Sequence, residues 1–217
     1  MSREVRIQSV SVGGNNPPRI LGVLNISPES FFSDSFTPCS QVFRRAEEMR
    51  RAGADIIDLG ARSTALHAPP LSVSEEKERV LSALKDLDGC GLPLSLDTCR
   101  PEVLTAALHY DIALVNDISG LADDAYAKAV ADSGLPAILM AANRIPGDPL
   151  NFAETTAALS AVLSRAEQYG ITDVILDPGV GKWTAERESA ADWELCRRFS
   201  ELKSYDLPLL AAVSRKS

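Results

Sequence analysis

The stretch that decides the fold prediction is Asp173–Gly181, with the sequence DVILDPGVG. An apolar run ends at Leu176 and delivers one carboxylate, Asp177, to a turn that contains a proline and two glycines. This pattern is typical of a buried strand in a parallel sheet. Apolar runs followed by polar residues recur in DIIDLG at 55–60, LPLSLDT at 92–98, IALVNDISG at 112–120 and LPLLAAVSRK at 207–216. A fold that repeats this unit gathers its polar side chains at one end, and we expect the functional site there.

Strand patterns alternate with helical patterns along the chain. The predicted strands are 20–24, 55–60, 92–97, 113–118, 136–140, 173–176 and 207–214, and the predicted helices are 41–52, 72–87, 100–110, 123–133, 152–169 and 190–205. Such alternation predicts parallel βαβ units. Residues 1–19 are polar and are interpreted as a lead-in with a turn at GGNNPP.

The number of units favours a barrel over an open sheet. Seven units in 217 residues match the pace of a (β/α)₈ barrel, which typically has ~250 residues. No GxGxxG follows a strand, which argues against a dinucleotide-binding open sheet. We therefore predict an α/β fold of the TIM (β/α)₈ type. Residues 1–217 would form a single domain that is incomplete at the C-terminus, with the eighth strand–helix unit missing from this chain.

Composition limits the class of partner. The net charge of −8 argues against a general binder of nucleic acid or of anionic membranes. No apolar run approaches the ~20 residues of a membrane-spanning helix. The four cysteines lie far apart without a CxxC pair, which predicts free thiols in a reducing cytoplasm and argues against zinc.

The strand ends resemble those of the dihydropteroate synthases, which are pterin-binding barrel enzymes. The resemblance rests on six motifs in the family order: LGVLNISPESFF (21–32), GADIIDLGARST (53–64), SLDT (95–98), VNDISGL (115–121), LDPGVG (176–181) and VSRKS (213–217). It implies a transferase that joins 6-hydroxymethyl-7,8-dihydropterin diphosphate to an arylamine and releases pyrophosphate. The arylamine would be p-aminobenzoate or a ribosyl-aminobenzene, in folate or methanopterin biosynthesis.

Three residues at strand ends suit a pterin ring. Asp97, Asn116 and Asp177 offer carboxylate and amide groups to the donors and acceptors on the edge of the heterocycle. Asp97 would also stabilise positive charge on the pterin methylene group as pyrophosphate departs. The alternative is that strand-end acids and amides cap the next helix, an interpretation that weighs more for Asp117. A structural role is the alternative for Asp58, which precedes the end of its strand.

The resemblance assigns further site residues. Lys216 would be catalytic and would also bind the pterin, because it follows an apolar strand and enters the mouth of the barrel. Ser217 and Thr64 would lie near the second substrate or the diphosphate, and Met140 would line the pterin pocket. Asn25 would contact Mg²⁺, with the diphosphate supplying other oxygens. Late helices that stay exposed would offer a face for a homodimer.

The second loop departs from the family pattern. It reads GARSTALHA (60–68) where the family usually has GGESTRPG, so that Arg62 replaces an acid and Ala65 an arginine. This loop and the DPGVGKW run resemble archaeal-type members. Two alternative functions remain open. One is a pterin-dependent methyltransferase barrel, although the VSRKS run is foreign to that class. The other is a non-catalytic pterin-binding protein.

Overall fold

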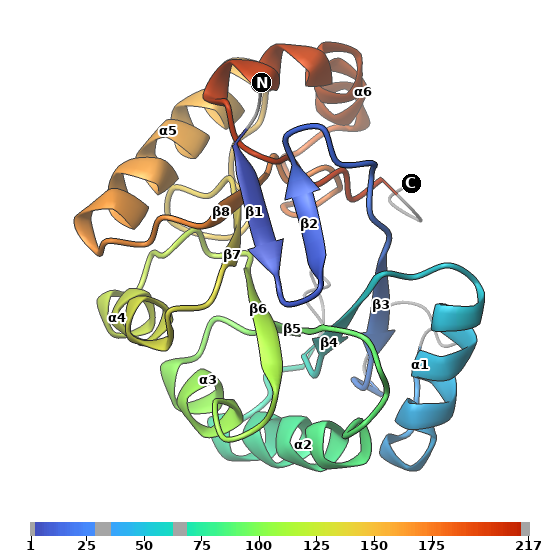
Figure 1. Cartoon of the computed structure of the whole chain (residues 1–217). Helices are drawn as coiled ribbons and strands as arrows, with labels where there is room; N and C mark the ends of the chain where they lie inside the picture. Colours follow the sequence, from blue (N-terminus) through green and yellow to red (C-terminus); the bar gives the residue numbers. More distant parts are fainter. Residues whose placement is uncertain (1–2, 29–35, 63–68, 214–217) are drawn as a thin grey trace.

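The computed structural model describes residues 3–28, 36–62 and 69–213. A parallel sheet of six strands, in the order β3-β4-β5-β6-β7-β8, forms its centre. The strands are β3 (Leu21–Asn25), β4 (Ile56–Gly60), β5 (Leu94–Asp97), β6 (Ile112–Asp117), β7 (Ala137–Met140) and β8 (Val174–Asp177). The helices are α1 (Val42–Arg51), α2 (Val73–Asp86), α3 (Pro101–Ala107), α4 (Asp124–Ser133), α5 (Phe152–Gln168) and α6 (Ser189–Arg198). The helices surround the sheet as an outer layer (Figure 1).

The predicted alternation of strands and helices is confirmed, and local sequence signals explain several boundaries. Ser72 caps α2 in a capping box with Glu75. Pro101 is the first residue of α3, where its missing N–H has no intrahelical partner to lose. Helix α3 ends at Ala107 and is therefore shorter than the predicted helix at 100–110.

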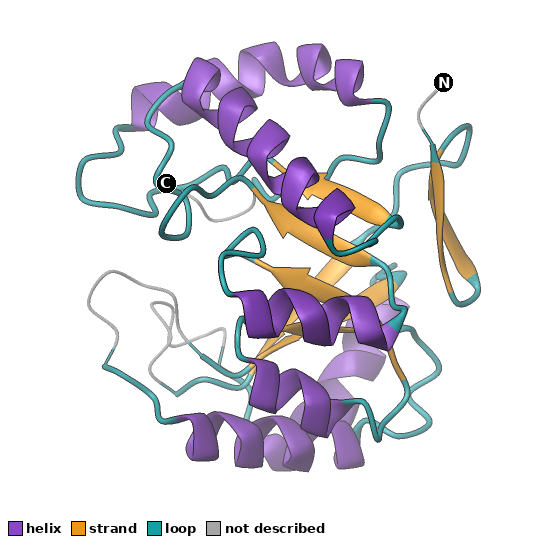
Figure 2. Cartoon of the chain, turned by 90° about the vertical axis from the view of Figure 1, so that its left-hand side faces the viewer, coloured by secondary structure: helices purple, strands orange, loops and turns teal. Residues whose placement is uncertain are grey.

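The first residues of the chain form a β-hairpin, so the prediction of a polar lead-in was wrong. Strand β1 (Glu4–Ile7) pairs antiparallel with β2 (Val10–Gly13). The hairpin lies across the end of the sheet at which the strands begin, opposite the end to which the strand arrows point (Figures 1 and 2). Val5 and Ile7 are buried there against inward-facing residues such as Ile56 and Ile138. The hairpin therefore closes the bottom of the barrel interior with apolar side chains.

Alternate residues of each strand face two different environments. Residues such as Ile57, Leu96 and Leu139 belong to the large apolar core shared with the helices. Their neighbours along the strands, among them Ile56 and Leu114, point to the interior that the hairpin closes. Since side chains on a strand alternate with a period of two, the polar residue two positions after each interior apolar residue lies on the interior face above it. This alternation places the polar strand ends inside the mouth of the barrel.

The C-terminal part of the described chain differs from the prediction. Residues 207–213 form no regular strand, although Leu209 makes a parallel bridge to Leu176 beside β8. The last helix is also interrupted: α6 ends at Arg198 and a 3₁₀ helix, Phe199–Tyr205, follows. Within the described residues β3 and β8 are the two edges of the sheet. Val23 on β3 is 61% exposed, although its neighbour in register, Asp58, is buried.

Candidate active site at the mouth of the barrel

The strand register brings most of the predicted site residues to one row. Asn25 is opposite Gly60, Gly60 is opposite Asp97, and Asp97 is opposite Asn116. Among the last two strands of the sheet, Met140 of β7 is opposite Asp177 of β8. Since neighbours in register share a face of the sheet, these residues converge on the same interior. The predicted site residues Thr64, Lys216 and Ser217 lie outside the described residues.

Asn116 is held by a buried carboxylate. Its Nδ2 donates to Asp58 Oδ2 at 3.0 Å, and the hydroxyl of Ser95 donates to Asp58 Oδ1 at 2.6 Å. All three side chains are buried. Asn116 Oδ1 is also buried, and it has no hydrogen-bond partner among the described residues. A buried polar atom without a partner is rare in folded proteins, because the loss of hydration is not compensated. This oxygen is therefore a candidate acceptor for a ligand N–H.

Burial perturbs both carboxyl groups of this cluster. It raises the pKa of Asp58 from 3.8 to about 6, although the hydrogen bonds from Ser95 and Asn116 favour the ionised form. Burial also raises the pKa of Asp97 well above its usual value, and the nearby Asp58 charge raises it further. The guanidinium group of Arg62 opposes this by lowering the pKa of Asp97. Carboxyl groups with such perturbed pKa values are typical of functional sites.

Gly60 leaves room for Asp97. A Cβ atom at position 60 would lie 3.4 Å from Asp97 Oδ2, so the carboxylate packs directly over this glycine. Arg62 follows two residues later, beyond the end of β4. The arginine that replaces the usual acid of the family motif thus lies close enough to Asp97 to act on its charge.

Asp177 and Met140 form the opposite wall. Asp177 Oδ1 accepts a hydrogen bond of 2.8 Å from the backbone N–H of Gly179. Gly179 has φ +72°, and a Cβ atom there would lie 3.2 Å from Met140 Cγ. The turn after β8 therefore packs on the Met140 side chain. This contact fixes both a carboxylate and an apolar surface at the mouth.

Asp117, in contrast, serves its own loop. Its carboxylate accepts hydrogen bonds from the N–H and the hydroxyl of Ser119 and from the N–H of Leu121, at 2.6 to 2.7 Å. Leu121 has φ +61°, an uncommon backbone conformation for leucine. The carboxylate stabilises this turn. Contrary to the structural alternative, it does not cap the next helix, because the N-cap of α4 is Asp123.

A second buried network was not predicted. Glu76 of α2 is 1% exposed, forms an ion pair with Arg100 at 3.0 Å and accepts a 2.6 Å hydrogen bond from Thr98. Arg100 also donates to the carbonyl of Leu71. The network fixes the loop that directly follows Asp97. Its only sequence signal is an acid in the first turn of a helix, which usually indicates an interaction with the helix dipole.

Asn25 ends β3 with a turn. Its Oδ1 accepts a 2.9 Å hydrogen bond from the N–H of Ser27, and its side chain is only partly buried. A neutral oxygen at this place fits one ligand position of Mg²⁺, which accepts few protein ligands. Among the described residues no group of three or more His, Cys, Asp or Glu side chains could hold a metal ion alone.

The loop after β8 is fixed to the loop after β7. Trp183 packs on Gly147, where a Cβ atom would lie 2.2 Å from the indole ring. Arg187, only 2% exposed, pairs with Asp192 at 2.9 Å and donates to the carbonyl of Pro149. Trp183, the last residue of the DPGVGKW run, therefore helps to hold these two loops together.

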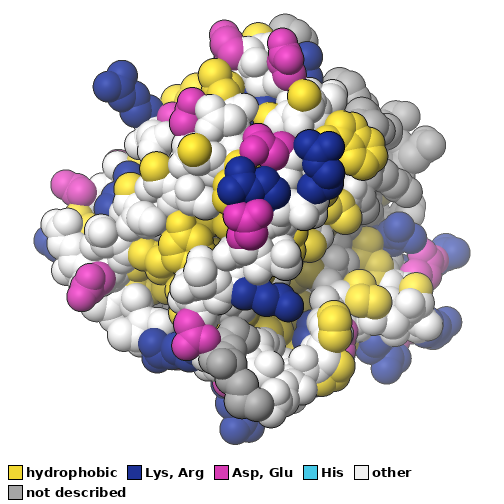
Figure 3. Space-filling view, turned by 90° about the horizontal axis from the view of Figure 1, so that it is seen from above, with side chains coloured by type: hydrophobic (Ala, Val, Ile, Leu, Met, Phe, Trp, Pro, Cys, Tyr) yellow, Lys and Arg dark blue, Asp and Glu magenta, His cyan; other side chains and the backbone are white. Residues whose placement is uncertain are grey.

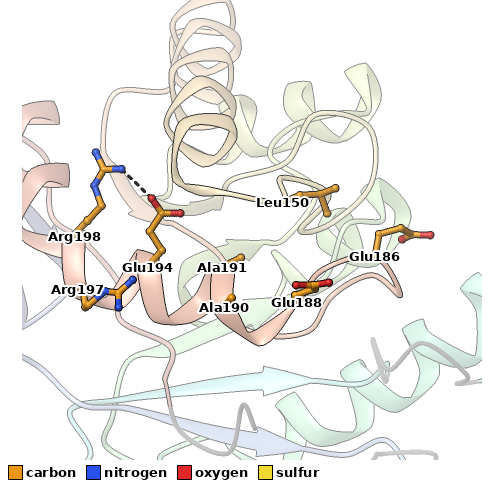
Figure 4. Close-up of a pocket in the computed structure, with 8 residues that line it drawn as sticks. All are labelled: Leu150, Glu186, Glu188, Ala190, Ala191, Glu194, Arg197 and Arg198. Carbon is orange, nitrogen blue, oxygen red and sulfur yellow. Dashed lines mark hydrogen bonds and ion pairs between the residues drawn. The ribbon is translucent and has the colours of Figure 1, made fainter.

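A surface hollow lies away from these residues. It is an open surface hollow of about 610 Å³ between Leu150 and the first turns of α6. Figure 4 shows the two glutamates that precede α6 beside it, and Arg198, which pairs with Glu194. On the face seen from above, acidic and basic side chains are interspersed (Figure 3). The hollow contains none of the predicted site residues, and its charges are of both signs.

Two general predictions concern the described residues as a whole. No helix in that part of the chain is long and apolar enough to cross a membrane. Cys39, Cys90, Cys99 and Cys196 are free thiols. Burial raises the pKa of the Cys99 thiol, which lies beside Asp117 and Asp97, so that Cys99 is a poor nucleophile.

Comparison with known proteins agrees with the site. The family model described as pterin binding enzyme matches residues 21–217. The dihydropteroate synthase of Escherichia coli strain K12 is 34% identical over 215 residues, which cover 92% of this chain and 74% of that protein. The enzyme of Synechocystis is 36% identical over 214 residues, which cover 91% and 72% respectively.

Solved structures show the same fold. A dihydropteroate synthase from Xanthomonas albilineans with 4-aminobenzoic acid superposes with a TM-score of 0.84, at 30% identity, over 100% of this chain and 80% of that one. A structure of a dihydropteroate synthase from the same bacterium with 7,8-dihydropteroate gives a TM-score of 0.80, at 29% identity, over 99% and 79%. These matches confirm the predicted α/β barrel class. The archaeal affinity of the second loop stays a prediction. The chain belongs to the pterin-binding enzyme family and is a transferase homologous to dihydropteroate synthase.

Proposed function

We propose that the protein joins 6-hydroxymethyl-7,8-dihydropterin diphosphate to an arylamine and releases pyrophosphate. The observation that carries the proposal is the interior cluster of Asp97, Asn116 and Asp177 at three strand ends, where the buried oxygen of Asn116 has no hydrogen-bond partner among the described residues. The relatives in complex with 4-aminobenzoic acid and with 7,8-dihydropteroate support it. p-Aminobenzoate is accordingly the first candidate acceptor, and a ribosyl-aminobenzene is the second.

Asn116 and Asp177 would bind the pterin edge. Asn116 Oδ1 would accept a ring or exocyclic N–H, and the carboxylate of Asp177, already fixed by Gly179, would accept others. Met140 would lie against the apolar face of the ring, since it forms the wall beside Gly179. Lys216 would donate to the pterin carbonyl. Thr64 and Ser217 would bind the arylamine or the diphosphate.

Asp97 would lower the barrier of the reaction. The bond between the pterin methylene carbon and the diphosphate oxygen breaks, and its electron pair leaves with pyrophosphate. The arylamine nitrogen then donates its lone pair to the methylene carbon and loses a proton. Positive charge develops on the methylene group in between. A carboxylate that burial destabilises gains much from a cation beside it, so Asp97 would stabilise this state more than the ground state.

Asn25 would take part in binding Mg²⁺ through Oδ1, together with oxygens of the diphosphate. Bound Mg²⁺ would neutralise the negative charge that accumulates on the leaving group. The single neutral oxygen at the end of β3 fits this role, because the diphosphate can supply the remaining anionic ligands. Removal of Mg²⁺ by a chelator should stop turnover and leave binding of free 6-hydroxymethylpterin unchanged.

Assembly and location belong to the same proposal. Residues 1–217 would form one domain, because a single large core joins strands and helices from β3 to the 3₁₀ helix after α6.

A second copy would pack on α6, where Trp193 is 69% exposed. The free thiols fit the cytoplasm. A Trp193→Glu variant that keeps the mass of the wild-type assembly in light scattering would contradict the α6 dimer.

The test is pyrophosphate release by the full-length gene product with dihydropterin diphosphate and Mg²⁺. Release that requires p-aminobenzoate supports the proposal, whereas release only with a ribosyl-aminobenzene changes the acceptor. Asp97→Asn and Lys216→Ala should abolish most turnover, and Lys85→Ala on the exposed end of α2 is the control. Tight pterin binding without release under any condition would favour a non-catalytic binding protein. Methyl transfer to a corrinoid protein would favour the methyltransferase alternative.

A further inference from the structure

Asp58 is a buried carboxylate that the proposed reaction leaves unused. It lies on the interior face of β4 and is 4% exposed. Both of its oxygens are occupied from neighbouring strands, Oδ1 by the hydroxyl of Ser95 and Oδ2 by the amide of Asn116. A group enclosed in this way does not reach a substrate, so any part it takes in the reaction must pass through its partners.

The contact with Asp58 fixes which atom Asn116 presents. An asparagine side chain can rotate by 180° and exchange its oxygen and nitrogen, and the two orientations have nearly the same shape. An ionised carboxylate can only accept hydrogen bonds, so only the orientation with Nδ2 towards Asp58 is favourable. Oδ1 is then left as the buried atom without a partner among the described residues.

We infer that Asp58 is a positioning residue for pterin recognition, because it holds the Asn116 amide with its carbonyl oxygen available to the ligand. The inference rests on the proposed function. It identifies Asp58 as the residue that makes the Asn116 position of the pterin site accept a ligand N–H group. Without Asp58, the Asn116 amide could present its NH₂ group instead, and this donor would then face the N–H donor of the pterin. A pterin N–H would lose its acceptor.

The Asp58→Asn substitution tests the inference with little change of shape. The Ser95 hydroxyl donates to residue 58, so we expect the carbonyl oxygen of the new amide to face Ser95 and its NH₂ group to face Asn116. Asn116 then rotates to accept that hydrogen bond and presents its own NH₂ group to the ligand. Affinity should fall about 10- to 100-fold, the range expected when a buried donor loses its acceptor.

The exchanged pair gives the rescue. In Asp58→Asn combined with Asn116→Asp, the new amide donates to the new carboxylate, whose second oxygen again faces the ligand as an acceptor. The total charge of the pair is unchanged. We expect this double variant to bind within about 5-fold of the wild type, since the hydrogen-bond pattern is restored. Ser95→Ala is the matched control, because it removes the other hydrogen bond of Asp58 and leaves the bond to Asn116.

The measurement is calorimetric binding of 6-hydroxymethylpterin to the full-length gene product at pH 8, together with the separate KM values of the two substrates. The KM of the pterin should rise in Asp58→Asn while the KM of the arylamine stays constant. Three results would overturn the inference: unchanged affinity in Asp58→Asn, no recovery in the exchanged pair, or an equal loss in Ser95→Ala. If the wild type itself binds no pterin, the proposed function fails and the inference fails with it.

Discussion

Replacing Asp58 by asparagine should increase the stability of the protein at neutral pH. The carboxylate is buried and its pKa is raised to about 6. The folded state therefore holds a proton between pH 4 and pH 6 that the unfolded state has released. By proton linkage, stability is then lost as the pH rises through this window and stays low above it. An asparagine at this position does not titrate.

The magnitude follows from the pKa values. A change from 3.8 to about 6 corresponds to roughly 3 kcal/mol of destabilisation at pH 7, at ~1.4 kcal/mol per pH unit. About 1 kcal/mol of this develops between pH 5 and pH 7 by the same relation. The neutral amide forms weaker hydrogen bonds than the carboxylate, and this loss offsets about 1 to 2 kcal/mol of the gain in the variant. We expect a net gain of about 1 to 2 kcal/mol at pH 7 and little or no gain at pH 5.

Urea unfolding of the wild type and of Asp58→Asn at several pH values from 5 to 8 measures the difference. Asp117 has a raised pKa in both proteins and cancels. Loss of the Asp58 charge also removes one cause of the raised pKa of Asp97, so the difference between the two curves measures Asp58 together with its effect on Asp97. Asp88→Asn, which removes an exposed carboxylate after α2, is the control variant. A loss of more than 2 kcal/mol at pH 7 that does not vary with pH would refute the reasoning. Asp58 would then stabilise the fold as an ion.

Three further predictions concern the reaction and the fold. Asp97→Asn should lower kcat about 100-fold or more without loss of stability in urea unfolding, and turnover close to the wild type would remove Asp97 from the mechanism. Gly147→Ala should lose about 2 to 4 kcal/mol in urea unfolding, because φ is +65° and a Cβ atom would meet the ring of Trp183. Gly170→Ala, with φ +73° and open space around it, should lose only about 1 kcal/mol; equal losses would contradict the packing argument. Ile7→Ala should cost about 2 to 4 kcal/mol, since the side chain is fully buried; a loss below 0.5 kcal/mol would show that the hairpin adds little to the core.

Much of the architecture was predictable because each unit carries its own signals. The apolar run before Asp177 and the glycine turn after it specify one buried strand and its end. Helix starts were visible at Ser72 and Pro101, where local hydrogen bonding and a fixed φ determine the boundary. The hairpin of β1 and β2 was missed. Its strands have only four residues each, and their apolar side chains become buried only by contact with the interior face of the sheet, which is distant in sequence.

The sequence by itself determined the order of strands and helices and the placement of Asp97, Asn116 and Asp177 at strand ends, because alternating patterns and turn residues act over a few neighbours. The tertiary structure decided which of these groups are paired. Asp58 and Asn116 are 58 residues apart in sequence, and their hydrogen bond spans β5. It forms because the register places Ser95 of β5 opposite Asp58 of β4, and Asp97 of β5 opposite Asn116 of β6. Glu76 likewise meets Arg100 only after α2 packs beside the loop that follows β5. Burial, and with it the raised pKa of each carboxyl group, depends on all the strands around it, and no local stretch of sequence encodes that.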